Sequence, residues 1–413
     1  MSESATSGPP RTIGPLQKRE VRLAWSLLFP TIAIVSAVVV LPLLAIFWIS
    51  FKPIGLADLR PPAPVVREAL RGAGEELRIE YRVRNSSQSE VINGVTLSDV
   101  LPGGVTVREL DERCEVSGDR INCSLGDMQG GARDRISVFV TLDGDEAVAE
   151  AAIEGSEPAM TGTGKNILTN LEFTLSNFAK ILDGEEFWGV LGATLFYTVF
   201  GTVGALVVGL FAAMLLNKEF RGQGVLRGLY LFPYVAPVIA VAFAWVILLD
   251  PFSGSVNELL VQMDVVDEKI NFFGDRPLAL IMVTVFEIWR YFPLSFLFIL
   301  ARMQSIDSDM YEAADMDGAS PFQKFWYLGL PQLLGILSVL FLLRFIWTFN
   351  KFDDIFLLTG GNAGTRTLTV NVYEQAFAVS NIGAGAAVAV VIFFCLLLFA
   401  YVFFRTMSQE EGL

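Results

Sequence analysis

The sequence predicts an all-α polytopic membrane protein with six transmembrane helices and one inserted β-sandwich domain. Of its 413 residues, 53% are hydrophobic and only 18% are charged. In soluble domains, roughly a quarter of all residues are charged. Six apolar runs are long enough to cross a bilayer. A segment between the first two runs instead alternates polar and apolar residues, as half-buried strands do.

Each apolar run exceeds the ~18 residues that distinguish a membrane span from a buried helix. The first, residues 23–51, is longer than a signal-peptide core and precedes no small-residue cleavage pattern, so we expect an anchored helix. The remaining five belong to a core at residues 171–405. They are residues 188–216, 226–249, 278–300, 333–358 and 384–404.

Lys and Arg predict the orientation of these spans. With a cytoplasmic N-terminus, the inner segments hold ten basic residues and the short outer loops only three, Lys269, Arg276 and Arg366. Short cytoplasmic loops are enriched in Lys and Arg. We therefore expect a multi-pass protein of the plasma (inner) membrane with both terminal tails, residues 1–22 and 406–413, in the cytoplasm.

Residues 58–165 then lie outside the cytoplasm. Leu77, Ile79, Tyr81 and Val83 alternate with polar neighbours, and residues 95–100, 101–107 and 135–142 repeat the pattern between Gly, Pro and Asp turn signals. Short strands of this kind predict a small β-sandwich.

Cys114 and Cys123 flank the hairpin-like stretch CEVSGDRINC. An oxidising compartment favours a disulfide between them, and two reduced buried thiols are the alternative. The stretches IEYRVRNSS, VTLSDVLPGGVTV and INCSLGDMQGGARDRISVFVTL resemble bacterial extracellular repeat domains of immunoglobulin-like type. That resemblance implies a binding or spacing role.

The chain contains no histidine, which excludes Ser-His-Asp and Cys-His catalysis and imidazole metal ligands. TGTGK at residues 161–165 departs from phosphate-loop spacing and is interpreted as a linker into the second span. We expect no enzyme activity, no metal and no bound cofactor. A net charge of −14 argues against nucleic acid as a partner.

The cytoplasmic loop at residues 302–331 contains YEAADMDGASPFQKFWYLGLPQ. A helix-forming acidic stretch ends at Gly318, and Ser320, Pro321 and Gln323 form a capping-box pattern that begins a second helix, which we expect Pro331 to end. Several exposed apolar residues close together favour contact with a partner protein. The alternative is a helix that lies on the lipid surface, but such a helix would be richer in Lys and Arg. The apolar residues available for docking are Met316, Phe322, Phe325 and Trp326.

This loop resembles the coupling loop of permease subunits of binding-protein-dependent ABC importers, in which E-A-A is followed after three residues by G and after nine more by I-x-L-P. Similarity to the carbohydrate-importing, maltose-type branch extends over residues 171–404, including 220–257, 287–296 and 352–362. The resemblance implies the fold of type I importers and docking on a separate ATPase that binds ATP and Mg. The coupling residues it implies are Glu312, Ala313, Ala314, Asp317, Gly318, Ala319, Phe325, Leu328, Leu330 and Pro331.

Ionisable groups within spans are costly and mark candidate pathways. Glu287 and Arg290 lie on one helical face, where they could form a structural ion pair with each other or contact a ligand. Pro233 and Pro237 are expected to break the third span around Tyr234. Resemblance to the maltose-type subunit implies a sugar site midway through the membrane. The candidate residues are Tyr234, Val238, Glu287, Arg290, Tyr291, Leu294, Trp347, Thr348, Asn350 and Lys351.

The leading hypothesis is one half of a sugar-import channel. Its expected partners are a second permease subunit, an ATPase dimer, an extracytoplasmic sugar-binding protein, the sugar and the lipid membrane. A membrane-anchored adhesion or sensor protein that uses the β-domain is the alternative. A secondary transporter is a third possibility, but no internal repeat supports it. Only the first hypothesis requires residues 312–331.

Overall fold

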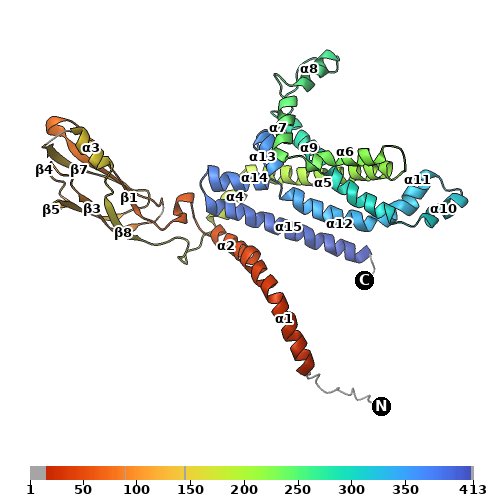
Figure 1. Cartoon of the computed structure of the whole chain (residues 1–413), viewed down its shortest axis with the longest axis horizontal. Helices are drawn as coiled ribbons and strands as arrows, with labels where there is room; N and C mark the ends of the chain where they lie inside the picture. Colours follow the sequence, from red (N-terminus) through yellow and green to blue (C-terminus); the bar gives the residue numbers. More distant parts are fainter. Residues whose placement is uncertain (1–14, 89, 144–145, 411–413) are drawn as a thin grey trace.

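A computed structural model describes residues 15–88, 90–143 and 146–410 of the chain. A β-sandwich lies at one end of the long axis, and the helical body extends away from it to the other (Figure 1). Residues 1–14 of the predicted N-terminal tail and residues 411–413 of the C-terminal tail lie outside the described residues. Helix α1 begins at Pro15, inside the predicted tail, and α15 continues to Glu410.

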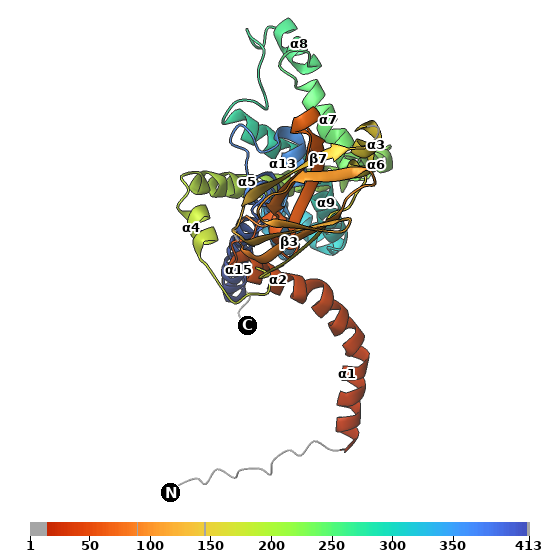
Figure 2. The same ribbon diagram turned by 90° about the vertical axis from the view of Figure 1, so that its left-hand side faces the viewer.

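Five helices are long and apolar enough to cross a membrane among the described residues, or six if one bent pair counts as a span. In the first, α1 (Pro15–Val35) continues through a π-helical turn (Ser36–Val40) into α2 (Leu41–Ser50). In both views α1 runs apart from the other helices (Figures 1 and 2). The other long helices are α5 (Glu186–Leu216), α9 (Leu278–Gln304), α12 (Leu330–Phe349, within the continuous helix Pro321–Phe349) and α15 (Ile382–Glu410).

The predicted third span is divided into α6 (Gln223–Val235) and α7 (Val238–Leu248), which meet at 90°. The break lies at Ala236 and Pro237 and not around Tyr234, which remains helical. Proline disfavours the helical conformation of the residue before it, and Ala236 has the extended angles φ −62° and ψ 143°. Pro233 stays inside α6.

The predicted fifth span at residues 333–358 is wrong as one continuous helix. Helix α12 ends at Phe349, and a separate helix, α13 (Asp353–Thr359), follows. The amide of Asn350 donates to the carbonyl oxygen of Ile346 at 2.8 Å and so caps the end of α12. The shorter helices of the body are α4 (Ser176–Leu182), α8 (Ser255–Gln262), α10 (Ser308–Met316), α11 (Pro321–Gln323) and α14 (Leu368–Tyr373), with π-helical turns at Lys324–Gly329 and Glu374–Ala378.

Small residues on α5 let it lie close against α9. A Cβ atom at Gly201 would lie 2.9 Å from Cγ of Glu287, and one at Gly209 would lie 2.7 Å from Cβ of Ser295. Contacts this short are not tolerated in packed interiors. The glycines of α5 therefore fix how deeply Glu287 is held between the helices.

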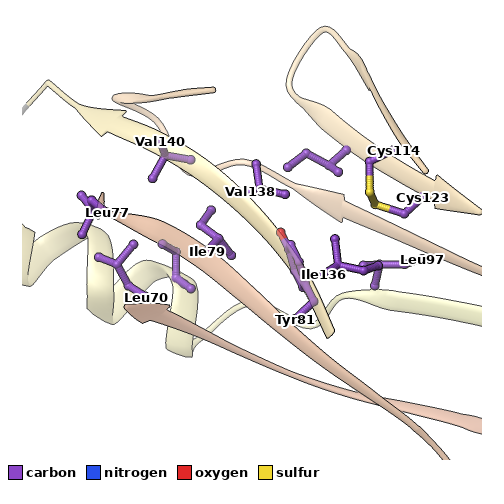
Figure 3. Close-up of a cluster of buried hydrophobic side chains, with 12 residues drawn as sticks. Leu70, Leu77, Ile79, Tyr81, Leu97, Cys114, Cys123, Ile136, Val138 and Val140 are labelled. Carbon is purple, nitrogen blue, oxygen red and sulfur yellow. A yellow bond between two sulfur atoms is a disulfide. The ribbon is translucent and has the colours of Figure 1, made fainter. Parts of the chain in front are cut away.

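The β-domain consists of two four-stranded antiparallel sheets in the orders β1-β2-β7-β4 and β5-β6-β3-β8, which confirms the predicted sandwich. Alternating residues of both sheets form its core, including Ile79, Tyr81, Leu97 and Ile136 (Figure 3). The strands are β1 (Pro64–Arg71), β2 (Arg78–Asn85), β3 (Ile92–Val100), β4 (Val105–Glu109), β5 (Cys114–Ser117), β6 (Arg120–Met128), β7 (Arg133–Leu142) and β8 (Ala159–Gly164).

Cys114 and Cys123 face each other across the β5–β6 hairpin and form a disulfide (Figure 3).

The structure corrects the interpretation of residues 161–165 as a linker, because Thr161 to Gly164 belong to β8 and pair with β3. The hydroxyl groups of Thr96 and Thr161 join the two strands at 2.7 Å. Helix α3 (Glu146–Glu154), which the strand pattern did not predict, places Ile153 in the core.

A carboxyl pair lies inside the sandwich. The hydroxyl group of Tyr81 donates to Asp99 at 2.7 Å, and that of Ser156 donates to Glu68. Burial, together with the neighbouring Asp99 carboxylate, raises the pKa of Glu68 from 4.5 to about 7, although the Ser156 hydrogen bond acts in the opposite direction.

The stability of the β-domain is therefore expected to depend on pH. The folded-state pKa of Glu68 exceeds its unfolded-state value of 4.5. The contribution of protonated Glu68 to the free energy of unfolding is therefore complete below about pH 4.5 and is lost as the pH rises through about 7. We expect a loss of about 1–2 kcal/mol, reduced by solvent screening at this half-buried group. Pulse proteolysis of the full-length protein in urea measures it. Glu68→Gln should flatten the profile between these pH values, and an unchanged slope would contradict this origin.

Candidate functional site

Glu287 is a fully buried charge of the helical body that is hydrogen-bonded on both carboxylate oxygens. It is 0% exposed on α9 and accepts hydrogen bonds from Arg344 at 2.6 Å and Thr348 at 2.9 Å, both on α12. Its other oxygen accepts from the hydroxyl group of Tyr197 on α5 at 3.0 Å. A buried carboxylate is tolerated when it is paired and hydrogen-bonded in this way. The arrangement joins three spanning helices at one point.

Of the two alternatives for Glu287 and Arg290, the ion pair between them does not form, since Glu287 pairs with Arg344. Arg290 instead donates to the carbonyl oxygens of Pro233 and Ala236, each at 3.1 Å. The 90° break between α6 and α7 leaves carbonyl groups without helical partners, and the guanidinium of Arg290 satisfies two of them. Arg290 thus holds the bent pair against α9.

A cavity of about 130 Å³ opens beside this cluster. Seven of its lining residues are among those implicated in the substrate pathway by the sequence, and the eighth is Arg344. Val238, Arg290 and Asn350 do not line it. The lining residues are Tyr234, Glu287, Tyr291, Leu294, Arg344, Trp347, Thr348 and Lys351.

The ring of Tyr291 lies at the centre of three cations. Its centroid is 4.5 Å from Nζ of Lys351 and 4.7 Å and 5.6 Å from the guanidinium carbons of Arg344 and Arg290. Cations within about 6 Å of an aromatic face are attracted by its quadrupole. The edge of Tyr291 also meets Tyr234, with ring centroids 6.1 Å apart. Aromatic faces beside charged donors suit a ligand with apolar ring faces and hydroxyl groups.

Lys351 also stands near two carboxylates beyond the end of α12. Its ammonium lies 3.3 Å from Asp353 and 4.0 Å from Asp354. Asp354 is 0% exposed, and neither of its side-chain oxygens has a hydrogen-bond partner among the described residues. The longer contact with Lys351 is therefore the main compensation for this buried carboxylate.

The predicted coupling loop lies at the end of the helical body opposite the β-sandwich (Figure 1). Asp307 caps α10 by accepting from the backbone N–H of Asp309 at 3.1 Å. The chain then turns at Gly318, whose φ of +77° lies in the left-handed region that glycine adopts without steric cost. Lys324 of the following turn pairs with Asp315 at 2.5 Å, which holds the two helices together.

The capping box that begins the second helix is confirmed. The backbone N–H of Ser320 donates to the Gln323 side chain at 2.8 Å, and that of Gln323 donates to Ser320 Oγ at 3.3 Å. Pro331, however, does not end this helix, because a single helix extends from Pro321 to Phe349. A π-helical turn at Lys324–Gly329 ends two residues before Pro331. Its wider winding accommodates the missing N–H and the bulk of the proline ring.

This segment exposes large apolar side chains. Met316 is 89% exposed, Phe322 and Tyr327 are each 72% exposed, and Trp326 is 52% exposed. Phe325 is half-buried, so Tyr327 replaces it among the exposed aromatic residues. Phe322 and Trp326 stack with centroids 6.2 Å apart. These side chains form one exposed apolar cluster, of the kind that marks an interaction surface.

Of the other coupling residues, Glu312, Ala313, Asp317, Gly318 and Pro331 are exposed, and Ala314, Ala319, Leu328 and Leu330 are half-buried. Sequence reasoning missed Arg344 and Tyr197. Arg344 carried a usable signal, because an ionisable residue inside an apolar run is a functional candidate. Tyr197 carried none.

The match to known proteins covers the helical body. Residues 205–410 match the family model described as "Binding-protein-dependent transport system inner membrane component". The chain is 39% identical over 228 residues to the inner membrane ABC transporter permease protein YcjO of Escherichia coli strain K12, covering 54% of this chain and 77% of that protein. It is 31% identical over 232 residues to the trehalose/maltose transport system permease protein MalF of Thermococcus litoralis, covering 56% and 78%.

A third relative is the trehalose transport system permease protein SugA of Mycobacterium tuberculosis strain H37Rv, with 28% identity over 56% of this chain and 73% of that protein. Among solved structures, the fold resembles a chain of the bacterial alginate ABC transporter crystallised with an alginate pentasaccharide-bound periplasmic protein. The TM-score is 0.53 at 18% identity, over 58% of this chain and 83% of that chain.

Proposed function

This chain belongs to the family of binding-protein-dependent transport system inner membrane components, and from that membership we propose that it forms half of the channel of an ATP-driven sugar importer. It is a transport permease and not an enzyme, and ATP hydrolysis is assigned to a separate ATPase. The observation that carries the proposal is the exposed segment 312–331, with Gly318 at φ +77° and uncovered aromatic side chains. The adhesion or sensor alternative gives this segment no role.

The pair α6–α7 is taken as one bent span, giving six spans. The β-sandwich lies at one end of the body, whereas α10, α11, the start of α1 and the end of α15 point to the other (Figure 1). This arrangement supports an extracytoplasmic β-domain and cytoplasmic ends of α1 and α15. The immunoglobulin-like type of the β-domain is proposed from the sequence resemblance alone. The coupling segment then faces the compartment that holds ATP.

The cavity beside Glu287 is proposed as this subunit's share of a sugar site. Sites for small ligands typically measure about 300–1,000 Å³, and this cavity holds about 130 Å³. A disaccharide therefore needs the matching surface of a second permease subunit. Names of relatives favour trehalose or maltose as the first substrates to test.

Co-purification tests the assembly. The tagged full-length chain, extracted gently from its native membrane and analysed by mass spectrometry, is expected to retain an ATPase, a second permease and an extracytoplasmic binding protein. Recovery of the intact chain without any ATPase would contradict the proposed function.

Trp347→Ala tests the sugar site. Trp347 lines the cavity and is 52% exposed, so its ring is accessible to a ligand. Loss of an aromatic contact at a binding site is expected to reduce sugar uptake about tenfold or more. Uptake of labelled sugar by proteoliposomes with all partners present measures the effect. Trp188→Ala is the matched control, since Trp188 is 70% exposed on α5 and lies outside the cavity. Equal uptake by both variants would contradict the assignment.

A further inference from the structure

The outer face of the sheet β1-β2-β7 carries a cluster of positive charge in a chain whose net charge is −14. Five arginine side chains are exposed there and line one cavity of about 650 Å³, together with Val65, Val83 and Asp134. They are Arg67, Arg82, Arg84, Arg133 and Arg135.

Strand register places these arginines in rows. Arg82 lies directly opposite Arg67 on one side and Arg135 on the other, and Arg84 lies opposite Arg133 in the next row. Neighbouring strands are about 4.8 Å apart, and like charges placed opposite each other on a sheet are destabilising. Packing of the core does not explain the arrangement, because these side chains point away from it.

The acidic groups nearby neutralise only part of this charge. Glu80 pairs with Arg82 at 2.5 Å and with Arg135 at 3.6 Å, and Asp134 pairs with Arg113 at 2.5 Å. Within residues 15–88, 90–143 and 146–410, Arg67, Arg84 and Arg133 form no ion pair. The face therefore retains cationic groups that are free to bind an anion.

The cavity continues toward the helical body. A second cavity, of about 430 Å³, shares Arg84 and Arg133 with the first and adds Arg60. A third, of about 380 Å³, shares Ala57 and Gln88 with the second and reaches Lys180 on α4. Basic side chains thus recur along three adjoining cavities, which together form one groove from the sandwich to the helical body. The third cavity also contains Asp58, which is 5% exposed and accepts hydrogen bonds from Ser87 and from the backbone of Gly55.

We propose that this arginine groove binds an anionic carbohydrate chain, a polymer of carboxylate-bearing sugars. Guanidinium groups bind carboxylates through paired, charge-assisted hydrogen bonds, and successive rows of arginine match charges repeated along a chain. None of the residues that line the three cavities is aromatic. Protein interfaces centre on aromatic anchors, and single-stranded nucleic acids and neutral sugars stack on aromatic faces. All three therefore fit the groove less well than a chain whose sugars carry carboxylates and bind through their charge.

Binding of short polygalacturonate chains to the full-length protein in nanodiscs tests the proposal, with neutral dextran of matched length beside it. Polygalacturonate is expected to bind in low salt and to weaken as salt rises, whereas dextran does not bind. The variant Arg67→Gln/Arg84→Gln/Arg133→Gln is expected to bind polygalacturonate at least about tenfold more weakly. It removes only the unpaired arginines, so the ion pairs of Glu80 remain.

The matched control is Arg71→Gln/Arg120→Gln/Lys165→Gln, which removes the same charge from exposed positions of the same domain outside the groove. It is expected to bind as the wild type does. Thermal unfolding should show that the groove variant is no less stable than the wild type, since like-charge repulsion has been removed. Absence of polygalacturonate binding, equal weakening by both variants, or tighter binding of polyphosphate or single-stranded DNA would overturn the proposal.

Discussion

Gly318→Val is expected to weaken the binding of this chain to its proposed ATPase partner. Gly318 adopts φ +77°, and left-handed geometry costs an L-residue about 1–2 kcal/mol, with β-branched residues the least tolerant. A Cβ atom there would meet no atom within 4 Å, so the effect arises from the backbone alone. The turn must change, which reorients α10 against Phe322 and Trp326. We expect the ATPase retained in co-purification, and sugar uptake with it, to fall at least about tenfold.

Gly318→Asn is the matched control, because asparagine enters the left-handed region more readily than other non-glycine residues. It should keep most of the ATPase and of the uptake. Loss of both activities in the asparagine variant would indicate contact of the partner with Gly318 itself. Full activity in the valine variant would contradict a role for this turn.

A second large effect is expected at the buried pair of Glu287 and Arg344. Their side chains are 1% and 3% exposed and lie 2.6 Å apart. Glu287→Gln leaves the guanidinium of Arg344 buried without its counter-charge, and breaking a buried pair in this way costs about 3–5 kcal/mol. Thermal unfolding of the purified protein in nanodiscs should show a clear loss of stability, with lower expression in the membrane.

The double variant Glu287→Gln/Arg344→Met separates charge compensation from packing. Replacing both partners removes the uncompensated charge, so we expect it to be more stable than Glu287→Gln alone, with a coupling energy of about 1–3 kcal/mol. Additive losses would show that the two residues do not stabilise each other. Sugar uptake by a stable double variant then reports whether these groups also bind the substrate.

Local patterns in the sequence predicted much of this architecture. The alternation around Tyr81 predicted strands of a sandwich, and the structure contains that sandwich. Ser320 and Gln323 predicted a capping box, which the structure also contains. Seven candidate pathway residues line one cavity. The strand and capping-box predictions succeeded because periodicity and caps act over a few residues, and local chain geometry decides them. The candidate pathway residues came instead from resemblance to a family, and their role in transport stays a prediction.

Contacts between distant residues could not be derived in the same way. Arg344 is 57 residues from Glu287, and a helical spacing of three favoured Arg290 in its place. Whether Arg290 pairs with a carboxylate or caps the carbonyls of Pro233 and Ala236 depends on the 90° bend between α6 and α7. Residues 161–164 likewise read as a linker until pairing with β3 is known.

The π-helical turn before Pro331 has a mechanical consequence. Because it lets the helix continue from Pro321 to Phe349, the exposed Phe322 and the buried Arg344 belong to one rigid rod. At 1.5 Å per residue they are about 33 Å apart along its axis. If the helix tilts by about 10° about its Phe322 end, Arg344 moves by about 6 Å over that length. This displacement is enough to separate Arg344 from Glu287. Under the proposed function the helix acts as a lever, so that motion of an ATPase docked at Phe322 moves the walls of the cavity beside Glu287.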